Sequence, residues 1–543
     1  MQAASIRYLD QGCNESVPIR DNRGWESVTG ADVDVRTKAG VVRGRWESGV
    51  AVFRGIPYAE PPFGLRRFAA PVPVMPWDGV REAITFGPPV PQAGHSGAVM
   101  SSVSGTAADG SGDCLTLNVW SPVLGAAGLP VLVWIHGGRY LQGSSANPHH
   151  DGAMLAARGV VVVSMNYRVG AEGFAHIHGA PDNRGILDQV AALRWVQDNI
   201  AALGGEPNTV TVFGQSAGAG SVAALLAMPM ATGLFRRAIA QSVPGTFFSP
   251  DLASTVSEAI AAELGARPAA HELARISPHT LIEATESVLQ KMPEFVEAWG
   301  PMALTPTPFS PIVDGEIIVE VPWRALATGA ARDIELLVGH TRDEYSLFNP
   351  YRGVEMPEEQ VSARLDQLAL AIRGDAYRTE YPDANASQRY EILNSDWLFR
   401  MPTLQLADAQ HSGGGRAWMY ELCWSFNRDE GASHSLDLLL VFGTLSIEDV
   451  RNHASALANA AEELRRVSDR MRSDWVRFAT SGDPGWPRYH PDTGTTRVYA
   501  SELLTGPYPE EGSRRIWREH DFGILDLPGH APRQETADKK PSA

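Results

Sequence analysis

The sequence predicts an α/β protein with a large, mostly parallel central sheet flanked by helices. Two continuous apolar runs, residues 131–135 and 160–163, lack polar alternation, which is typical of strands buried on both faces. Between residues 188 and 203 the apolar positions step by three and four, as on one face of an amphipathic helix. A third strand pattern, residues 209–213, then runs through a glycine-rich turn into strong helix formers. This β-α-β order favours parallel strands joined by right-handed crossovers.

The bulk composition is that of an ordinary soluble globular chain. It has 543 residues, 44% of them hydrophobic and 20% charged, enough to bury a large core. The formal net charge of −17 argues against nucleic acid or an anionic membrane as a partner. No apolar stretch approaches 18 residues and no secretory signal is visible at the start, so no membrane contact is expected. The three dispersed cysteines, Cys13, Cys114 and Cys423, do not suggest a disulfide framework, which favours a cytoplasmic location.

The domain prediction is an N-terminal arm over residues 1–26, one large domain over 27–530 and a disordered tail over 531–543. No internal repeat or long linker divides the central part. Smaller expectations concern the first half of the chain: an antiparallel pair over 33–37 and 41–44, an ordered proline-rich loop over 53–62, and a flexible loop over 94–112 that rims a site. Later strands are expected at 334–338 and 417–422, and a late amphipathic helix at 464–478.

The motif with the clearest chemistry is Gly214-x-Ser216-x-Gly218, between the predicted strand and helix. A serine on such a sharp turn has a strained backbone, and the flanking glycines let strand and helix pass closely. The helix N-terminus then directs free N–H groups towards any negative charge that develops beside Ser216. The pattern predicts a nucleophile elbow and therefore an α/β-hydrolase fold.

A nucleophilic serine needs a general base held by an acid, and in this fold the chain order is serine, acid, histidine. The strand ending at Val338 leads to Asp343 and Glu344, either of which can be the acid. His340 and His434 are both candidates for the base, and their order in the chain favours His434.

The negative oxygen of a tetrahedral intermediate needs preorganised N–H donors, which are worth about 3 kcal/mol each. One predicted donor is the N–H of Ala217, directly after the nucleophile. The others are expected from the turn after residues 131–135, which reads Gly137-Gly138-Arg139. We therefore predict an oxyanion hole made by Gly138, Arg139 and Ala217, with Gly137 in support.

With these motifs the sequence resembles the type B carboxylesterase family, which includes bacterial p-nitrobenzyl esterases and carbamate hydrolases. The resemblance covers roughly residues 35–489. It rests on six further segments: 53–59 (FRGIPYA), 113–119 (DCLTLNV), 166–170 (NYRVG), 183–189 (NRGILDQ), 396–399 (DWLF) and 475–479 (WVRFA). It implies that Glu344 is the acid and His434 the base. It also implies that Ser242 is a buried second serine that supports the histidine loop through Asp437.

Three features depart from the family pattern. The usual disulfide partner of Cys114 is missing from the preceding loop, residues 86–92. Val243 replaces the glycine that usually comes after Gln-Ser at 241–242. Arg139 stands where the family has a third glycine or an alanine, beside the expected substrate. Its side chain can pair with a nearby acid, restrict substrates by bulk, or bind an anionic substrate group, and all three remain open.

The resulting functional prediction is a serine hydrolase that cleaves carboxylic esters through an acyl-enzyme on Ser216. Hydrolysis of carbamates or activated amides by the same triad is the alternative. The expected partner is a small-molecule ester, no cofactor is implied, and the oligomeric state is left open. A metal hydrolase is a rival, but His149-His150 and His176-Ile177-His178 lack a metal-ligand pattern. A catalytically inactive binding protein would be expected to have lost the nucleophile or the histidine.

Overall fold

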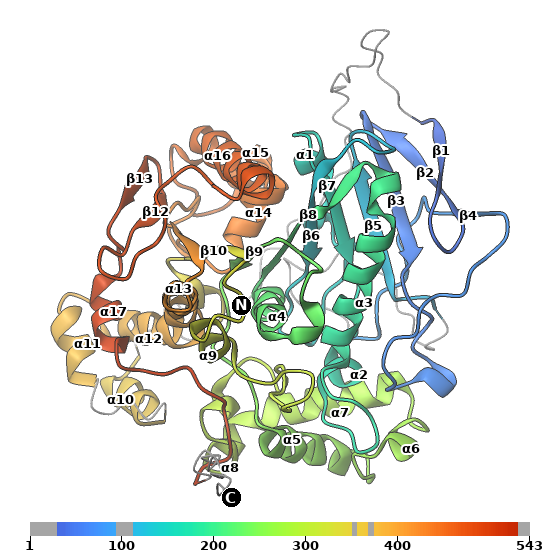
Figure 1. The fold of residues 1–543 in the computed structure, drawn as a ribbon. Coiled ribbons are helices and arrows are strands. Elements are labelled where there is room, and N and C mark those ends of the chain that lie inside the picture. The colour runs from blue at the N-terminus through green and yellow to red at the C-terminus, as the bar shows by residue number, and fades with distance from the viewer. Residues whose placement is uncertain (1–29, 94–111, 350–355, 368–373, 530–543) are drawn as a thin grey trace, which may run out of the picture.

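A sheet of 13 strands runs through the molecule and collects segments from both halves of the chain (Figure 1). The structure, a computed structural model, describes residues 30–93, 112–349, 356–367 and 374–529. The predicted arm (1–26), almost all of the predicted flexible loop (94–112) and the predicted tail (531–543) lie outside these residues. The strands are β1 Asp32–Arg36, β2 Val41–Glu47, β3 Val50–Pro57, β4 Val80–Glu82, β5 Thr116–Ser121, β6 Leu129–Ile135, β7 Val161–Met165, β8 Gly205–Gln215, β9 Arg237–Gln241, β10 Glu335–Thr341, β11 Arg416–Leu422, β12 Thr496–Tyr499 and β13 Leu503–Gly506.

The middle of the sheet is parallel, as the apolar runs predict. The spatial order is β1-β2-β3-β5-β7-β6-β8-β9-β10-β11-β12-β13, with β4 paired to β2. All pairs from β7 through β12 are parallel, whereas β1, β2, β3, β5 and β13 join antiparallel. Every residue of β7, β9 and β10 is buried, which accounts for the absence of polar alternation in their sequences.

The first half of the chain contains one correction. The antiparallel pair of β1 and β2 is confirmed, with Arg36 opposite Val41. The expected loop at 53–62 is wrong in its first half, because β3 extends to Pro57 and pairs with β5. Its ladder shifts register between Phe53 and Ile56, around Gly55 with a φ of +73°. A bulge at a glycine lets the strand continue where the sequence looks irregular.

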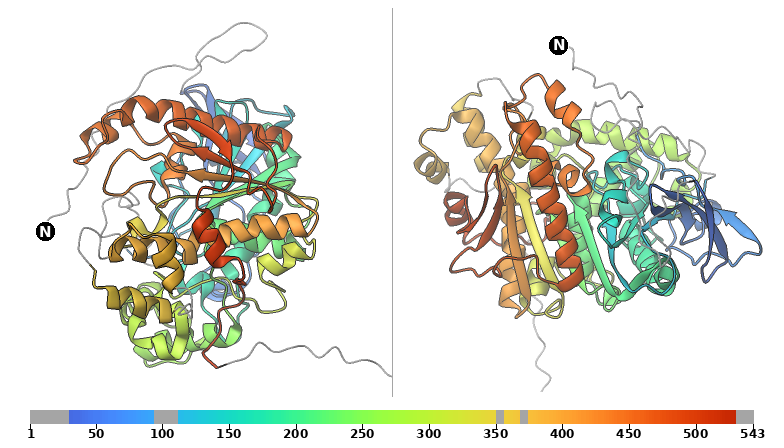
Figure 2. Two further views of the ribbon diagram at one scale, coloured as in Figure 1. Left: turned by 90° about the vertical axis from the view of Figure 1, so that its left-hand side faces the viewer. Right: turned by 90° about the horizontal axis from the view of Figure 1, so that it is seen from above.

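Helices cover both faces of the sheet (Figures 1 and 2). One apolar core lies between the sheet and α3, α4, α9 and α13, and the second lies between the opposite face and α1, α14 and α16. The helices are α1 Ala153–Ala156, α2 Gly170–Phe174, α3 Arg184–Asn199, α4 Ala217–Ala227, α5 Pro250–Glu263, α6 Ala270–Leu273, α7 Pro278–Lys291, α8 Val296–Trp299, α9 Pro322–Ala327, α10 Glu358–Gln367, α11 Gly374–Glu380, α12 Ala386–Ser395, α13 Met401–Ser412, α14 Leu436–Phe442, α15 Ile447–Asn452, α16 Ala460–Ser481 and α17 Glu511–Trp517.

Two long insertions interrupt the parallel part of the sheet. The first, between β9 and β10, carries α5 to α9, and the second, between β10 and β11, carries α10 to α13. Both groups lie on the lower side of the view in Figure 1, below α14 to α16. Among the described residues, no helix is both long and apolar enough to cross a membrane.

Candidate active site

The glycine turn after β8 has the geometry of a nucleophile elbow. Ser216 has φ 58° and ψ −126°, a conformation that costs an L-residue about 1–3 kcal/mol. A Cβ on Gly214 would lie 2.5 Å from the carbonyl oxygen of Gly218, and one on Gly218 would lie 2.1 Å from that of Ile135. The close passage of strand and helix therefore requires both glycines. Ser216 is 8% exposed, and its Oγ has no hydrogen-bond partner in the described part of the chain.

Glu344 and His434 meet although they lie after different strands. Nδ1 of His434 donates a short hydrogen bond to Oε2 of Glu344, which lies in the turn after β10. The rings of Phe399 and Phe348 pack against the imidazole, with centroids 4.3 and 5.2 Å away. Because an ionised carboxylate only accepts hydrogen bonds, Nδ1 carries the proton and Nε2 of the neutral ring remains the basic nitrogen.

The Glu344 carboxylate is fully buried and held in its ionised form. Its Oε1 accepts hydrogen bonds from Oγ of Ser242 (2.5 Å) and from the N–H of Thr341 (2.9 Å). Burial by itself would raise the pKa of Glu344, but the charge interaction and hydrogen bond with His434 and the bond from Ser242 together lower it. The acid is thus preorganised to hold an imidazolium.

The two alternatives for acid and base have other partners. Asp343 forms an ion pair with Arg342 and accepts a hydrogen bond from the N–H of Ala432, so it anchors the segment just before His434. His340 is buried, with Nε2 2.8 Å from the hydroxyl of Tyr508, and burial lowers its pKa to about 4. In the described part of the chain, neither the Asp343 carboxylate nor the His340 imidazole forms a hydrogen bond with Ser216.

The second serine acts differently from the expectation. Ser242 bonds Glu344 directly rather than working through Asp437. Asp437 instead accepts hydrogen bonds from Nε2 of Gln241 (2.9 Å) and the hydroxyl of Tyr420 (2.7 Å), which fix the start of α14. The reason is topological: Ser242 comes directly after β9, beside β10, so its nearest carboxylate is the one in the turn after β10.

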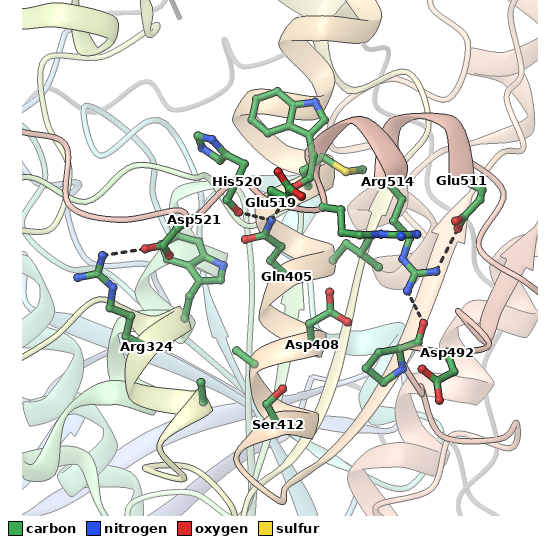
Figure 3. A pocket seen from close by; sticks show the side chains of 18 residues that line it. Arg324, Gln405, Asp408, Ser412, Asp492, Glu511, Arg514, Glu519, His520 and Asp521 are labelled. Carbon is green, nitrogen blue, oxygen red and sulfur yellow. Dashed lines mark hydrogen bonds and ion pairs between the residues drawn. The ribbon is translucent and has the colours of Figure 1, made fainter. Parts of the chain in front are cut away.

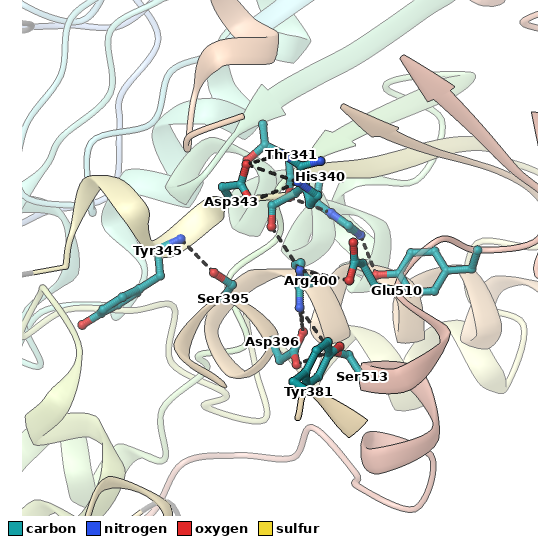
Figure 4. A network of polar contacts seen from close by, with 12 residues as sticks. His340, Thr341, Asp343, Tyr345, Tyr381, Ser395, Asp396, Arg400, Glu510 and Ser513 are labelled. Atoms are coloured by element: carbon teal, nitrogen blue, oxygen red, sulfur yellow. Dashed lines mark hydrogen bonds and ion pairs between the residues drawn. The ribbon is translucent and has the colours of Figure 1, made fainter. Parts of the chain in front are cut away.

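A buried polar network holds in place the turn that carries Glu344 (Figure 4). A π-helical turn, Asp396–Arg400, joins α12 to α13, and within it Arg400 pairs with Asp396. Nη1 of Arg400 also donates to the carbonyl of Arg342, and Oγ of Ser395 accepts from the N–H of Tyr345. These bonds fix the backbone on both sides of Glu344, and the same π-helical turn supplies the Phe399 ring that packs on His434.

The backbone N–H groups of Gly138, Arg139 and Ala217, the three predicted donors, are among those near the elbow that have no acceptor among the described residues. A Cβ on Gly137 would lie 3.1 Å from Cβ of Ser216 and 2.7 Å from the carbonyl oxygen of Gln215, so this turn lies directly against Ser216. Gly138 has a φ of +116°, and a Cβ there would collide with the carbonyl of Gln142. The arrangement can donate hydrogen bonds to a developing oxyanion.

Arg139 ends this turn with its side chain directed towards the insertion after β9. Nη1 donates to the carbonyl of Pro306 at 3.2 Å, and Oγ1 of Thr307 donates to the Arg139 carbonyl at 2.7 Å. In the described part of the chain the guanidinium pairs with no carboxylate, and burial lowers its pKa. Its side chain lines a small cavity of about 50 Å³ together with Gln142 and Glu286.

Gln215, the residue before the nucleophile, was not among the predicted site residues. Its side chain is 2% exposed, and its Nε2 lies 3.0 Å from Nε2 and 3.5 Å from Nδ1 of His434. Two such similar distances place the amide over the imidazole rather than in line with the Nε2 lone pair. Its position in the sequence could have indicated this, because the last strand residue before an elbow lies beside the elbow serine.

The histidine pairs of the metal hypothesis are occupied by other contacts. Nδ1 of His150 lies 3.2 Å from the carbonyl of Ser144, and burial lowers the pKa of His150 to about 3. His176 contacts Asp182 at 3.1 Å. The described residues contain no group of three or more histidine, cysteine, aspartate or glutamate side chains placed to bind a metal ion.

A larger cavity of about 870 Å³ lies elsewhere, between α9, α13 and α17 (Figure 3). Two ion pairs lie in its walls, Arg324 with Asp521 and Arg514 with Glu511. None of the predicted site residues lines it.

The sheet order, the strained serine between strand and helix, and the acid and histidine on later loops define an α/β-hydrolase. The chain belongs to the carboxylesterase family, whose model matches residues 31–501, and it is a carboxylic ester hydrolase. It is 38% identical to a para-nitrobenzyl esterase of Bacillus subtilis (strain 168) over 89% of this chain and 97% of that one. It is 34% identical to a fumonisin B1 esterase of Sphingopyxis macrogoltabida (87% of each chain) and to a phenmedipham hydrolase of Pseudarthrobacter oxydans (86% of this chain, 94% of the relative).

Solved structures agree with this assignment. A PNB esterase superposes with a TM-score of 0.75 at 35% identity, covering 89% of this chain and 99% of the other. A carboxylesterase of Geobacillus stearothermophilus has a TM-score of 0.74 with the same identity and coverage. The predicted α/β-hydrolase fold is confirmed.

Proposed function

We propose that the enzyme hydrolyses small-molecule carboxylic esters through an acyl-enzyme on Ser216, with His434 as general base and Glu344 as the acid that orients it. The observation that carries the proposal is the buried Glu344–His434 contact beside an elbow serine whose Oγ has no other partner among the described residues. Neutral His434 takes the proton of Ser216 as Oγ attacks the ester carbonyl. The N–H groups of Gly138, Arg139 and Ala217 stabilise the oxyanion.

His434 then gives the proton to the leaving alkoxide, and the ester C–O bond breaks to release the alcohol. In the second half the same imidazole takes a proton from water as the water attacks the acyl carbon; the bond to Oγ of Ser216 then breaks, the carboxylic acid is released and His434 returns the proton to Oγ. Glu344 stays ionised and stabilises the imidazolium in both halves. No cofactor takes part, so a chelator such as EDTA should leave the activity unchanged. We place this chemistry in the cytoplasm, on the basis of the sparse cysteines, and in a single domain over residues 27–530.

Hydrolysis of carbamates is the second candidate function, because one relative is named phenmedipham hydrolase. Carbamates and activated amides acylate the same serine, so the triad does not distinguish them from esters.

The test combines a covalent probe with a substrate panel. A fluorophosphonate should label the wild-type protein at Ser216, and Ser216→Ala should abolish both labelling and turnover. Matched aryl esters and aryl carbamates then rank the two functions by kcat/KM. Labelling at a different serine, or full activity in Ser216→Ala, would overturn the proposal.

A further inference from the structure

The turn of the proposed oxyanion hole has an unusual backbone at two residues that carry side chains. Gly138, Arg139 and Tyr140 have successive positive φ angles of 116°, 60° and 57°. Glycine adopts such angles readily, but residues with a Cβ rarely do, and they keep them only where the surrounding structure holds them. The N–H of Arg139 is one of the three proposed oxyanion donors, so the contacts that hold this turn also set the direction of that donor.

Two peptide groups flank the Cα atom of Arg139, and each is held at its carbonyl. The Gly138 carbonyl accepts hydrogen bonds from the N–H groups of Leu141 and Gln142, both at 3.1 Å and both within the turn. The Arg139 carbonyl accepts from Oγ1 of Thr307 at 2.7 Å, and Thr307 lies in the insertion between β9 and β10. Because peptide groups are planar, holding both of them fixes the backbone torsions of Arg139 and therefore the direction of its N–H.

The Thr307 hydroxyl has a single hydrogen, and its surroundings direct that hydrogen to Arg139. Thr307 is 7% exposed, and its Oγ1 accepts a hydrogen bond from the N–H of Phe309 at 3.1 Å. A second carbonyl, that of Phe309, lies 3.4 Å from Oγ1, so the carbonyl of Arg139 at 2.7 Å is the better acceptor. Oγ1 of Thr305 in turn donates to the Thr307 carbonyl at 2.7 Å. The donor is thus itself held in place.

The Arg139 side chain makes a second contact with the same segment. Its Nη1 donates to the carbonyl of Pro306, directly before Thr307, at 3.2 Å. This contact depends on the side chain at position 139, whereas the Thr307 bond reaches a backbone atom that any residue there would carry. The segment 306–307 therefore holds the turn through both the main chain and the side chain of Arg139.

We infer that Thr307 is a positioning residue for the proposed oxyanion hole: its hydroxyl holds the Arg139 peptide group so that the Arg139 N–H stays directed at the reacting carbonyl. This inference rests on the proposed function of the turn. An N–H donor stabilises an oxyanion because it is fixed before the charge develops. Loss of the Thr307 hydroxyl should therefore raise the energy of the transition state more than that of the bound substrate.

The experiment compares Thr307→Val with Thr307→Ser on a p-nitrophenyl ester, with rates expressed per active site titrated by a fluorophosphonate. Valine keeps the branched shape of threonine without the hydroxyl, so kcat should fall about ten- to hundredfold while KM changes by less than about threefold. Serine keeps the hydroxyl, so its kcat should stay within about threefold of the wild-type value.

A transition-state analogue gives a second measurement. An alkyl trifluoromethyl ketone forms a tetrahedral adduct on the nucleophilic serine, and the adduct carries a negative oxygen like that of the intermediate. Its Ki should rise in Thr307→Val by the same factor by which kcat/KM falls. Acetyl and butyryl esters separate positioning from substrate contact, because the loss of kcat should be the same for both acyl groups.

Thr496→Val is the matched control. Thr496 is a fully buried threonine of β12 whose Oγ1 donates to the carbonyl of Gly494 at 2.8 Å, so its replacement removes the same kind of bond. Strands β9, β10 and β11 lie between β12 and the nucleophile strand β8. The kcat of Thr496→Val and its Ki for the ketone should therefore equal the wild-type values within about twofold.

Three results would each overturn the inference: wild-type kcat and Ki in Thr307→Val, an equal loss in Thr307→Ser or Thr496→Val, or a loss that depends on the acyl group. Failure of the proposed function would look different, since Ser216→Ala or His434→Ala would then retain activity whatever the result at position 307.

Discussion

Two neighbouring strands each end in a glutamine with a serine directly after it, and we propose different roles for the two serines. Gln215 of β8 lies in register with Gln241 of β9. The serines have nearly the same positive φ, 58° at Ser216 and 59° at Ser242. Each serine N–H donates to the next strand, to the carbonyls of Gln241 and Gly339 respectively. The positive φ and the N–H bond to the next strand therefore do not distinguish the two serines.

The difference lies in the residue after each serine and in the surroundings of the hydroxyl. Ala217 opens helix α4, and its N–H has no acceptor in the described part of the chain. Val243 begins no helix, and its N–H donates to Oγ1 of Thr403. Ser216 is 8% exposed, and its Oγ is unbonded among the described residues, whereas Ser242 is fully buried with its Oγ on Glu344. Access and a free neighbouring N–H, rather than strain, distinguish Ser216, the proposed nucleophile, from Ser242.

The largest expected effect comes from exchanging the two serines in turn for alanine. Ser216→Ala should reduce kcat by at least about 10³-fold, since it removes the nucleophile. Ser242→Ala should cost about tenfold, because the acid remains but loses one hydrogen bond. Steady-state kinetics on a p-nitrophenyl ester measures both. The double variant Ser216→Ala/His434→Ala should be no worse than either single one, because the two residues act as a unit. Equal losses of kcat in Ser216→Ala and Ser242→Ala would contradict the proposal that the two serines have different roles.

The second prediction tests which carboxylate Ser242 serves. Glu344→Gln should lower kcat by about 10²- to 10⁴-fold, because an amide no longer stabilises the imidazolium. Asp343→Asn should change kcat by less than about tenfold while lowering thermal stability, since Asp343 anchors the loop before His434. The pair is matched in chemistry and adjacent in the chain. If Asp343→Asn were the more damaging of the two, the assignment of the acid would be wrong.

The third prediction concerns the stability that Ser242 contributes through Glu344. A carboxyl whose folded pKa is lowered stabilises the fold above its unfolded pKa, and this contribution is lost as pH falls through the folded value. Ser242→Ala removes a bond that lowers this pKa, so the variant should lose about 1–3 kcal/mol of unfolding free energy at pH 7. The difference from wild type should shrink below about pH 4. Urea unfolding at pH 7 and at several pH values below 4 measures it, and a difference that stays the same over this whole range would contradict the argument.

The smallest expected effect is on selectivity at the turn facing Ser216. Arg139→Gly should raise kcat/KM for bulky neutral esters by about three- to tenfold and lower the relative preference for esters that carry an anionic group. The physical reason is that the guanidinium, paired here with a carbonyl and no described carboxylate, offers a bidentate partner to an anion. Matched neutral and anionic esters provide the measurement. If the ratio of kcat/KM for neutral and anionic esters were unchanged, Arg139 would have no part in selectivity.

The parallel sheet and the elbow could be predicted from local patterns in the sequence. Long apolar runs and the 3.6-residue period are such patterns, and β6, β7, α3 and β8 formed where they predicted. The need for glycine at positions 214 and 218 could also be predicted, because the close passage of a strand and a helix that requires it is a local feature. The strand at 50–57 was missed in part because a bulge at Gly55 hides its alternation.

Residues with equivalent local patterns are distinguished only in the assembled fold. Asp343 and Glu344 are neighbours of the same chemistry, and the turn after β10 directs one to Arg342 and the other to His434. Ser242 bonds Glu344 rather than reaching Asp437, and Gln215 lies over the imidazole, because strand order brings residues 90 to 219 positions apart into contact. No local pattern contains such distances. The direction of a side chain across a sheet is set by the register of its neighbours, and register arises only when the strands come together.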